Sequence, residues 1–155
     1  IGTPERLAIE LGAGTGLRGV DVRRPQWGDV RDGWIEITQE KTGDEVSIPI
    51  VEELRAALAA APSISTHVLT SARGKPYSLG GFEAMVARAT DNAKLALSFH
   101  GLRKYAAVRL VEAGCTVEEA RAITGHRTDA MRRRYAQTAS RKKLATAAVA
   151  KLKKW

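Results

Sequence analysis

The sequence predicts a mainly α-helical domain with a small antiparallel β-sheet near its N-terminus. Two runs in which polar and apolar residues alternate, 33–38 and 45–50, flank a Thr-Gly-Asp turn and predict a β-hairpin. From residue 51 onward the spacing of apolar residues is helical, with proline, glycine and serine at the breaks. The 155 residues are enough for one domain that buries its core without disulfides or metal.

The N-terminal segment is predicted to form two short helices. Pro4 stands at a first-turn position, and apolar residues follow it at helical spacing. We expect this helix to end in the glycine-rich stretch 12–16 and a second one to begin at 17–21. A phosphate-binding loop is not predicted, because no Gly-Lys-Ser/Thr follows these glycines and no strand precedes them.

The hairpin has two further expected features. Residues 26–30 are expected to add a third, short strand, and Pro49 to mark a sheet edge or the end of its strand. Lys41 lies in the connection 39–44 between the two main strands.

Helix-ending and helix-capping residues divide the rest of the chain. Pro62 ends an alanine-rich helix, and Gly114 is typical of a left-handed helix stop. Thr116 with Glu119 three residues later predicts a capping box for a short helix. The expected helices span about 51–61, 79–92, 100–114, 116–125 and 141–153.

The net charge of +8 is concentrated in the C-terminal third of the chain. Residues 101–155 contain 14 Lys and Arg against 4 Asp and Glu, whereas residues 1–100 contain 11 against 13. Such asymmetry favours a polyanionic partner, most often nucleic acid, although a solvated basic face stays open. A membrane surface is less favoured because the basic helices have few large apolar anchors, and we expect no membrane partner. Cys115 is the single cysteine, which excludes an internal disulfide and fits a cytoplasmic, DNA-associated protein.

The segment 123–135 places His126 and Tyr135 nine residues apart, with four arginines between them. A tyrosine hydroxyl has an unperturbed pKa near 10, so as a nucleophile it needs a positive field or help with its proton. The alternative is a helix residue whose ring is half buried and whose hydroxyl contacts water.

Four further candidates lie upstream. His100 and Arg103 are three residues apart and therefore share one face of a helix. Arg18 follows a Thr-Gly-Leu turn, and Lys41 lies in the hairpin connection. Each motif alone is weak, since a histidine near a helix start can simply bind a loop carbonyl.

In this order and with these flanking residues, the set resembles the catalytic domain of tyrosine recombinases, the phage integrase family. Thr15-Gly-Leu-Arg18, with Asp21 after it, is similar to the first arginine box, and Lys41-Thr-Gly to the hairpin lysine. His100-Gly-Leu-Arg103 and Thr124-Gly-His126 are similar to the second box, and Tyr135 stands where the nucleophile stands. The resemblance implies that residues 1–155 form the C-terminal catalytic domain, without the N-terminal core-binding domain that family members normally have.

The resemblance assigns phosphate binding to Arg18, Arg103 and His126. The forked donors of arginine suit the non-bridging oxygens of a scissile phosphate, where negative charge develops in the transition state. His126 would donate a further hydrogen bond to the same group. Asp21 would brace a neighbouring site residue, or would simply form an ion pair within its helix.

The same resemblance assigns the chemical steps to the remaining residues. Tyr135 would be the nucleophile that forms a 3′-phosphotyrosyl bond, and Lys41 the general acid that protonates the departing 5′ oxygen. His100 would orient the site or accept the proton of the tyrosine. No metal ion, cofactor or ATP is expected.

The implied function is that of a site-specific DNA recombinase, an integrase acting on double-stranded DNA attachment sites. We expect a homo-tetramer on DNA, and the isolated domain to be either assembled or monomeric. Two alternatives stay open: a type IB topoisomerase-like nicking and rejoining activity, and a non-catalytic basic DNA-binding module. The last helix is expected to dock either on a neighbouring protomer or on its own core.

Overall fold

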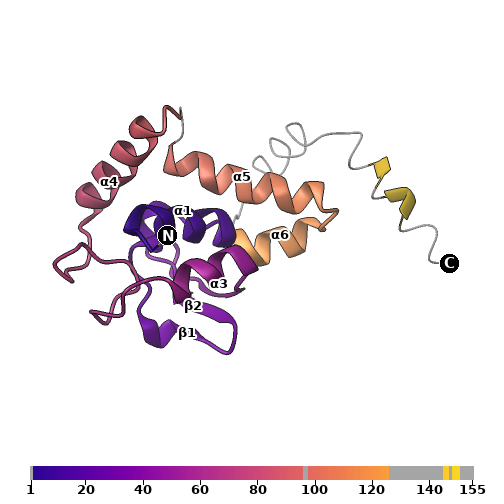
Figure 1. The fold of residues 1–155 in the computed structure, drawn as a ribbon. Coiled ribbons are helices and arrows are strands. Elements are labelled where there is room, and N and C mark those ends of the chain that lie inside the picture. Colours follow the sequence, from indigo (N-terminus) through magenta and orange to yellow (C-terminus); the bar gives the residue numbers. More distant parts are fainter. Residues whose placement is uncertain (1, 96–97, 126–144, 147, 151–155) are drawn as a thin grey trace.

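The computed structural model describes residues 2–95, 98–125, 145–146 and 148–150, which form helices around one small sheet (Figure 1). The sheet lies near the N-terminus, so the predicted fold class is confirmed. The strands are β1 (Val30–Arg31), β2 (Trp34–Thr38) and β3 (Glu45–Pro49). The helices are α1 (Pro4–Thr15), α2 (Gly19–Val22), the 3₁₀ helix η1 (Trp27–Asp29), α3 (Glu52–Ala59), α4 (Leu79–Asn92), α5 (Phe99–Glu112) and α6 (Val117–Thr124).

The sheet is antiparallel in the order β1-β2-β3. In the β2–β3 hairpin, Ile35 pairs with Ile48 and Ile37 with Val46. Ile35, Val46 and Ile48 are buried, and the residues between them on β3 are exposed. The alternation therefore selects the face that packs on the core, as predicted. Pro49 is the last residue of β3, where the missing N–H interrupts no further pairing.

The expected third strand over 26–30 is wrong for most of its length. Residues 27–29 form η1, and only Val30 and Arg31 pair with β2. The Asp29 carboxylate accepts a hydrogen bond from the Gln26 backbone N–H at 2.8 Å, and the Asp29 N–H donates to the Gln26 carbonyl at 3.0 Å. A short acidic side chain thus supplies local hydrogen bonds that compete with strand pairing.

Helix α1 is longer than predicted, because Gly12 and Gly14 lie inside it. Thr3 caps its first turn and Pro4 occupies the first helical position. A Cβ added at Gly12 would lie 2.7 Å from Cζ of Phe99, so this glycine permits close packing of α5 on α1. The chain leaves the helix only at Gly16, whose φ of 63° is left-handed.

The core lies where α1 packs against α3 and α5 and the sheet closes one side (Figure 1). Leu11 of α1 and Leu54 of α3 are fully buried. Phe82 of α4 and Phe99 of α5 meet edge to face, with ring centroids 4.9 Å apart. This packing brings the C-terminal end of α1 next to α5, where the candidate residues lie.

Side-chain caps begin the later helices. The hydroxyls of Ser78, Ser98 and Thr116 each accept a hydrogen bond from the N–H three residues later. The predicted capping box is confirmed, because the Glu119 carboxylate also accepts from the Thr116 backbone N–H. Gly125 ends α6 with a φ of 63°.

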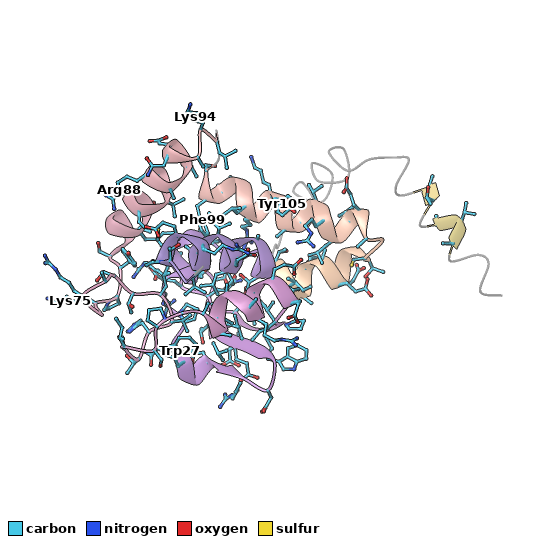
Figure 2. All side chains as sticks on the ribbon, in the orientation of Figure 1. Trp27, Lys75, Arg88, Lys94, Phe99 and Tyr105 are labelled. Carbon is cyan, nitrogen blue, oxygen red and sulfur yellow. The ribbon has the colours of Figure 1, made fainter. Side chains whose placement is uncertain are left out.

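Exposed cations lie on α4, in the loop before it and just after its end. Lys75, Arg88 and Lys94 extend away from the ribbon, and Tyr105 lies exposed on α5 (Figure 2). No helix in the described part of the chain is long and apolar enough to cross a membrane.

Of the helix expected over 141–153, the structure describes residues 145–146 and 148–150, which are helical. The remaining residues of that segment lie outside the described ones.

Candidate active site

Arg18 is positioned by the turn that follows α1. The Thr15 hydroxyl donates to the Leu11 carbonyl and accepts the Leu17 N–H at 3.2 Å, which holds the chain as it leaves the helix. Gly16 then takes its left-handed conformation, and Arg18 becomes the cap residue of α2. The Arg18 side chain is about one quarter exposed. Its guanidinium therefore lies at the surface of the core, with part of its donor edge open to solvent.

Arg103 lies deeper than Arg18, with 3% of its surface exposed. Its Nη1 donates to the carbonyl of Gly16 at 2.7 Å, across 87 positions of sequence. This bond satisfies one of the carbonyls at the end of α1 and fixes α5 against the turn that presents Arg18.

The turn after α6 repeats the arrangement of the turn after α1. The Thr124 hydroxyl donates to the Ala120 carbonyl at 2.7 Å, and Gly125 has the same φ of 63° as Gly16. The two Thr-Gly pairs are in contact, since a Cβ added at Gly16 would lie 3.1 Å from Cγ2 of Thr124. His126 follows this second turn directly in the sequence, although its own position lies outside the described residues.

The hairpin connection that carries Lys41 is held against α2. The buried carboxylate of Asp21 accepts the backbone N–H of Glu40 through Oδ1 at 2.8 Å. Oδ2 of Asp21 lies 3.9 Å from Nη1 of Arg18. The contacts of Asp21 are therefore compatible with a brace to a neighbouring segment and with an ion pair to Arg18. The brace to the hairpin is a hydrogen bond of normal length, whereas the contact with Arg18 is a long ion pair.

Four of the six predicted residues lie around one pocket of about 540 Å³, which we call the site pocket. Arg18, Lys41, His100 and Arg103 come from three separate segments of the chain, with the last two on α5, and line this one space. Lys41 and His100 are exposed, so they can reach a bound molecule. The pocket is also lined by Glu40 and Glu83 and by the apolar side chains of Leu17, Val20, Phe82 and Phe99.

The arrangement suits a phosphate ester. Two guanidinium groups, one ammonium group and one imidazole line this space, together with a group of apolar side chains and two carboxylates. Arginine donors bind non-bridging oxygens, while a lysine can both attract the anion and transfer a proton. An apolar wall excludes water on one side and strengthens these interactions.

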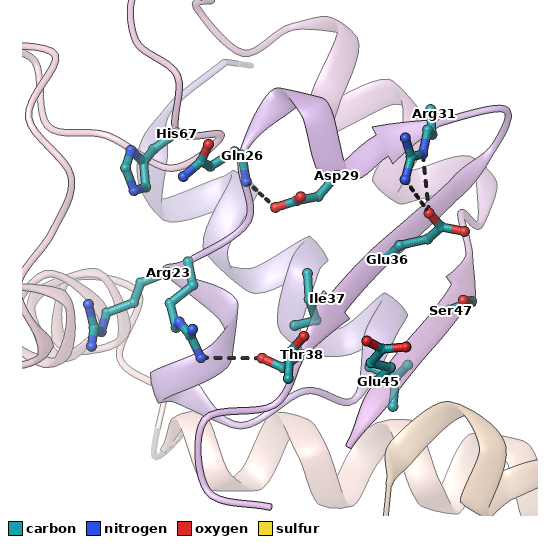
Figure 3. Close-up of a pocket in the computed structure, with 12 residues that line it drawn as sticks. Arg23, Gln26, Asp29, Arg31, Glu36, Ile37, Thr38, Glu45, Ser47 and His67 are labelled. Carbon is teal, nitrogen blue, oxygen red and sulfur yellow. Dashed lines mark hydrogen bonds and ion pairs between the residues drawn. The ribbon is translucent and has the colours of Figure 1, made fainter. Parts of the chain in front are cut away.

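A second, larger pocket of about 700 Å³, the sheet pocket, lies over η1 and the outer part of the sheet (Figure 3). It also contains arginines, and each of them contacts an acceptor oxygen within the chain. Arg31 donates to the Glu36 carboxylate through Nε at 3.1 Å and Nη2 at 2.8 Å, and this bond raises the pKa of Arg31. Arg24 donates to the Thr38 carbonyl at 3.3 Å. His67, which lies between α3 and α4, lines the same pocket.

Gln39 is not among the predicted residues, yet it is fully buried beside the site pocket. Its Oε1 accepts a hydrogen bond from Nη1 of Arg18 at 2.8 Å. No sequence pattern distinguishes this glutamine; its only signal is that it stands two residues before Lys41, at the end of β2.

The other two predicted residues, His126 and Tyr135, lie outside the described residues. Their proximity to the site pocket therefore stays a prediction. Within the described ranges, no three or more His, Cys, Asp or Glu side chains are grouped so that they could hold a metal ion.

Comparisons with known proteins find similar sequences and folds over most of the chain. The model of the phage integrase family matches residues 1–142. The integrase of Escherichia phage lambda is 31% identical over 144 residues, which cover 84% of this chain and 40% of the phage protein. The chain thus spans about 40% of the length of this curated relative.

Two solved structures of lambda integrase have the same fold. The catalytic core aligns with a TM-score of 0.68 and 29% identity, over 81% of each chain. A lambda integrase tetramer bound to a Holliday junction aligns with a TM-score of 0.68 and 30% identity, over 81% of this chain and 41% of that one.

Proposed function

Because the chain belongs to the phage integrase family, we propose that residues 1–155 are the catalytic domain of a site-specific DNA recombinase. The observation that carries the proposal is the meeting of Arg18, Lys41, His100 and Arg103 at one pocket. These residues are separated by up to 85 positions in the sequence, and the fold gives each of them access to the same small space.

Arg18 and Arg103 hold the scissile phosphate in this proposal. Arg103 is fixed by its bond to the Gly16 carbonyl, and Arg18 by its bond to Gln39. Each bond uses Nη1 of its guanidinium. Donors held in advance need little reorganisation as charge develops on the phosphoryl oxygens, which is the condition for large electrostatic stabilisation. His126 adds a hydrogen bond to the same phosphate.

Strand cleavage is the attack of the Tyr135 hydroxyl oxygen on the phosphorus. A phosphotyrosyl bond forms at the 3′ side, the bond from phosphorus to the 5′ oxygen breaks, and Lys41 gives its proton to that oxygen. His100 accepts the tyrosine proton or orients the site. Rejoining runs in reverse, with a 5′ hydroxyl of the same or another strand as the nucleophile. The phosphodiester energy is kept in the intermediate, so no ATP is consumed, and cationic side chains stabilise the charge that a metal ion would otherwise stabilise.

Double-stranded DNA attachment sites are the proposed substrate, and a homo-tetramer is the proposed assembly on them. The lambda integrase tetramer bound to a Holliday junction supports this assembly by similarity. The basic charge of the C-terminal third supports contact with DNA phosphates along the chain. We place the protein with DNA inside the cell.

Covalent trapping tests the proposal. The protein is incubated with supercoiled DNA in excess EDTA, at a protein concentration that saturates the DNA. The reaction is then quenched with detergent and examined for DNA-linked protein and relaxed circles. We expect a covalent product from the wild-type chain and none from Tyr135→Phe. Tyr105→Phe is the matched control, because Tyr105 is an exposed tyrosine on α5 that contacts Arg109.

Two outcomes would overturn the proposal. One is a wild-type chain that binds the DNA to saturation without forming the covalent product, which would leave a basic DNA-binding module. The other is a covalent product that survives Tyr135→Phe. Relaxed circles without exchange between two duplexes would instead identify a topoisomerase-like use of the same site.

A further inference from the structure

We propose that Gln39 is a positioning residue of the DNA-cleavage site, which sets the orientation of Arg18 and of the loop that carries Lys41. The inference rests on the proposed function and deepens it. Gln39 directly follows β2, and its side chain is fully buried. A glutamine is costly to bury unless its amide is hydrogen-bonded, so its partners indicate what it does.

The acceptor of the amide faces Arg18. Oε1 of Gln39 accepts from Nη1 of Arg18 at 2.8 Å and from the Thr42 hydroxyl at 3.2 Å. Arginine has donors only, so the carbonyl oxygen of the amide, and not its nitrogen, must point toward Arg18. One bond therefore fixes both the orientation of the amide and one edge of the guanidinium.

A neutral acceptor is suited to this position. Gln39 holds Arg18 without a countercharge, so the positive charge of the guanidinium stays available to a phosphate. The nearest described carboxylate oxygen is Oδ2 of Asp21, at 3.9 Å. A glutamate in place of Gln39 would still accept from Arg18, but it would also neutralise the charge that the phosphate requires.

The same residue closes the loop that carries Lys41. The Gln39 backbone N–H donates to the Asp44 carbonyl at 2.8 Å, and the Gly43 N–H donates to the Gln39 carbonyl at 2.9 Å. With the bond from Thr42, both the backbone and the side chain of Gln39 hold the loop over 39–44. Lys41, itself exposed, is thus carried by a loop that is anchored at its base.

The nitrogen of the amide faces the end of α6. A Cβ added at Gly125 would lie 2.5 Å from Nε2 of Gln39, so the two groups are in close contact. Nε2 is buried and has no hydrogen-bond partner among the residues that the structure describes. His126 is the next residue after Gly125. Gln39 therefore touches the turn that precedes a proposed phosphate ligand, in addition to Arg18 and the Lys41 loop.

Two substitutions separate positioning from simple stability. Gln39→Leu removes the acceptor at similar volume, and we expect covalent-product formation to fall about 100-fold, as for a misplaced catalytic group. Gln39→Glu keeps the bond to Arg18 but adds a charge, so its cleavage should also fall while Arg18 stays ordered. Thr90→Val is the matched control, because Thr90 is buried and donates to the Ala87 carbonyl at 2.9 Å on α4.

The decisive readout is the NMR signal of the Arg18 guanidinium, assigned by its loss in Arg18→Lys. In the wild-type chain and in Gln39→Glu we expect the hindered rotation of a hydrogen-bonded guanidinium, and in Gln39→Leu the averaged signal of a free one. Thr90→Val should leave both this signal and cleavage unchanged. If Gln39→Leu does not fold, Gln39→Glu tests the inference instead. We expect it to show an ordered Arg18 signal together with reduced cleavage.

An unchanged Arg18 signal in folded Gln39→Leu would overturn the inference, and so would a loss of cleavage in Thr90→Val as large as that in Gln39→Leu. The proposed function fails separately. If the wild-type chain bound to DNA forms no covalent product, the function is refuted, whereas the Arg18 signal still decides whether Gln39 orients this arginine.

Discussion

The two pockets differ in how their arginines are used. In the sheet pocket, Arg31 is paired with Glu36, and Arg23 and Arg24 lie 3.8 and 3.7 Å from the Glu40 carboxylate. In the site pocket, Arg18 is held by a neutral amide and Arg103 by a backbone carbonyl, and each is bonded there through Nη1. The cations of the larger pocket therefore lie closer to carboxylates than Arg18 does, because the carboxylate contact of Arg18 is the long ion pair with Asp21 at 3.9 Å.

This difference matters more than pocket volume. A carboxylate that pairs with an arginine removes the field that an anionic ligand needs, whereas a carbonyl or amide acceptor orients the arginine and leaves its charge. The partners of a cation thus indicate whether it stabilises the fold alone or also binds a ligand.

Of the substitutions that test this difference, removal of Arg103 from the site pocket should have the largest combined effect on cleavage and stability. We expect Arg103→Ala to lower the rate of covalent-product formation by about 10²–10³-fold, as for the loss of one oxyanion donor. The Gly16 carbonyl would also lose its partner, which costs roughly 1–3 kcal/mol of unfolding free energy. Single-turnover cleavage and chemical denaturation measure the two effects, and a variant with wild-type cleavage would contradict the role of the site pocket.

Lys41→Ala should affect the chemistry without affecting stability. Lys41 is exposed, so its removal should leave the midpoint of thermal unfolding unchanged. Cleavage should slow by about 10²–10⁴-fold if it is the general acid. A substrate with sulfur in place of the departing 5′ oxygen needs no proton, so it should restore the rate. Failure of this substrate to restore the rate would assign Lys41 to phosphate binding instead.

Substitution of Asp21 should have a smaller effect, and it distinguishes a brace to the hairpin from an ion pair with Arg18. Asp21→Ala removes the acceptor of the Glu40 N–H, and we expect a loss of roughly 1–3 kcal/mol of unfolding free energy. Asp21→Asn keeps an acceptor oxygen and should recover most of that loss, together with cleavage. If the asparagine variant is as defective as the alanine variant, the charge beside Arg18 matters more than the brace to the hairpin.

Arg31→Ala should have the smallest effect. Its ion pair with Glu36 is exposed, and such pairs contribute little to stability. We expect cleavage and duplex binding to equal those of the wild-type chain. Weaker duplex binding, measured by fluorescence anisotropy, would show that the sheet pocket also contacts DNA and that the contrast between the two pockets is incomplete.

Local sequence signals predicted most of the elements. Alternation over β2 and β3 and the Thr116 capping box each depend on contacts within a few residues, and both predictions are confirmed. The glycines of α1 were misjudged because their reason is Phe99, which lies 87 positions away from Gly12. The strand predicted over 26–30 is wrong because the Asp29 carboxylate accepts a hydrogen bond from the Gln26 N–H. Hydrophobic alternation does not reveal such a local bond.

Arg18, Lys41, His100 and Arg103 line one pocket, and their assignment to a catalytic site stays a prediction that comes from motifs with recognisable flanking turns. Thr15-Gly16 precedes Arg18, and Thr124-Gly125 precedes His126; in both cases the glycine ends a helix. Gln39 has no such motif, and its importance arises only from burial beside Arg18. The positions of His126 and Tyr135 stay predictions.

The bond between Arg103 and the Gly16 carbonyl has a consequence for how the site arises during folding. The two groups are 87 positions apart, so closing this contact requires most of the described chain to be in place. Contacts of such long range form late and slow the folding of a domain. We therefore expect local helices and the hairpin to form first, and anion affinity to appear only in the final cooperative step, so that partly folded chains do not engage DNA phosphates through this pocket.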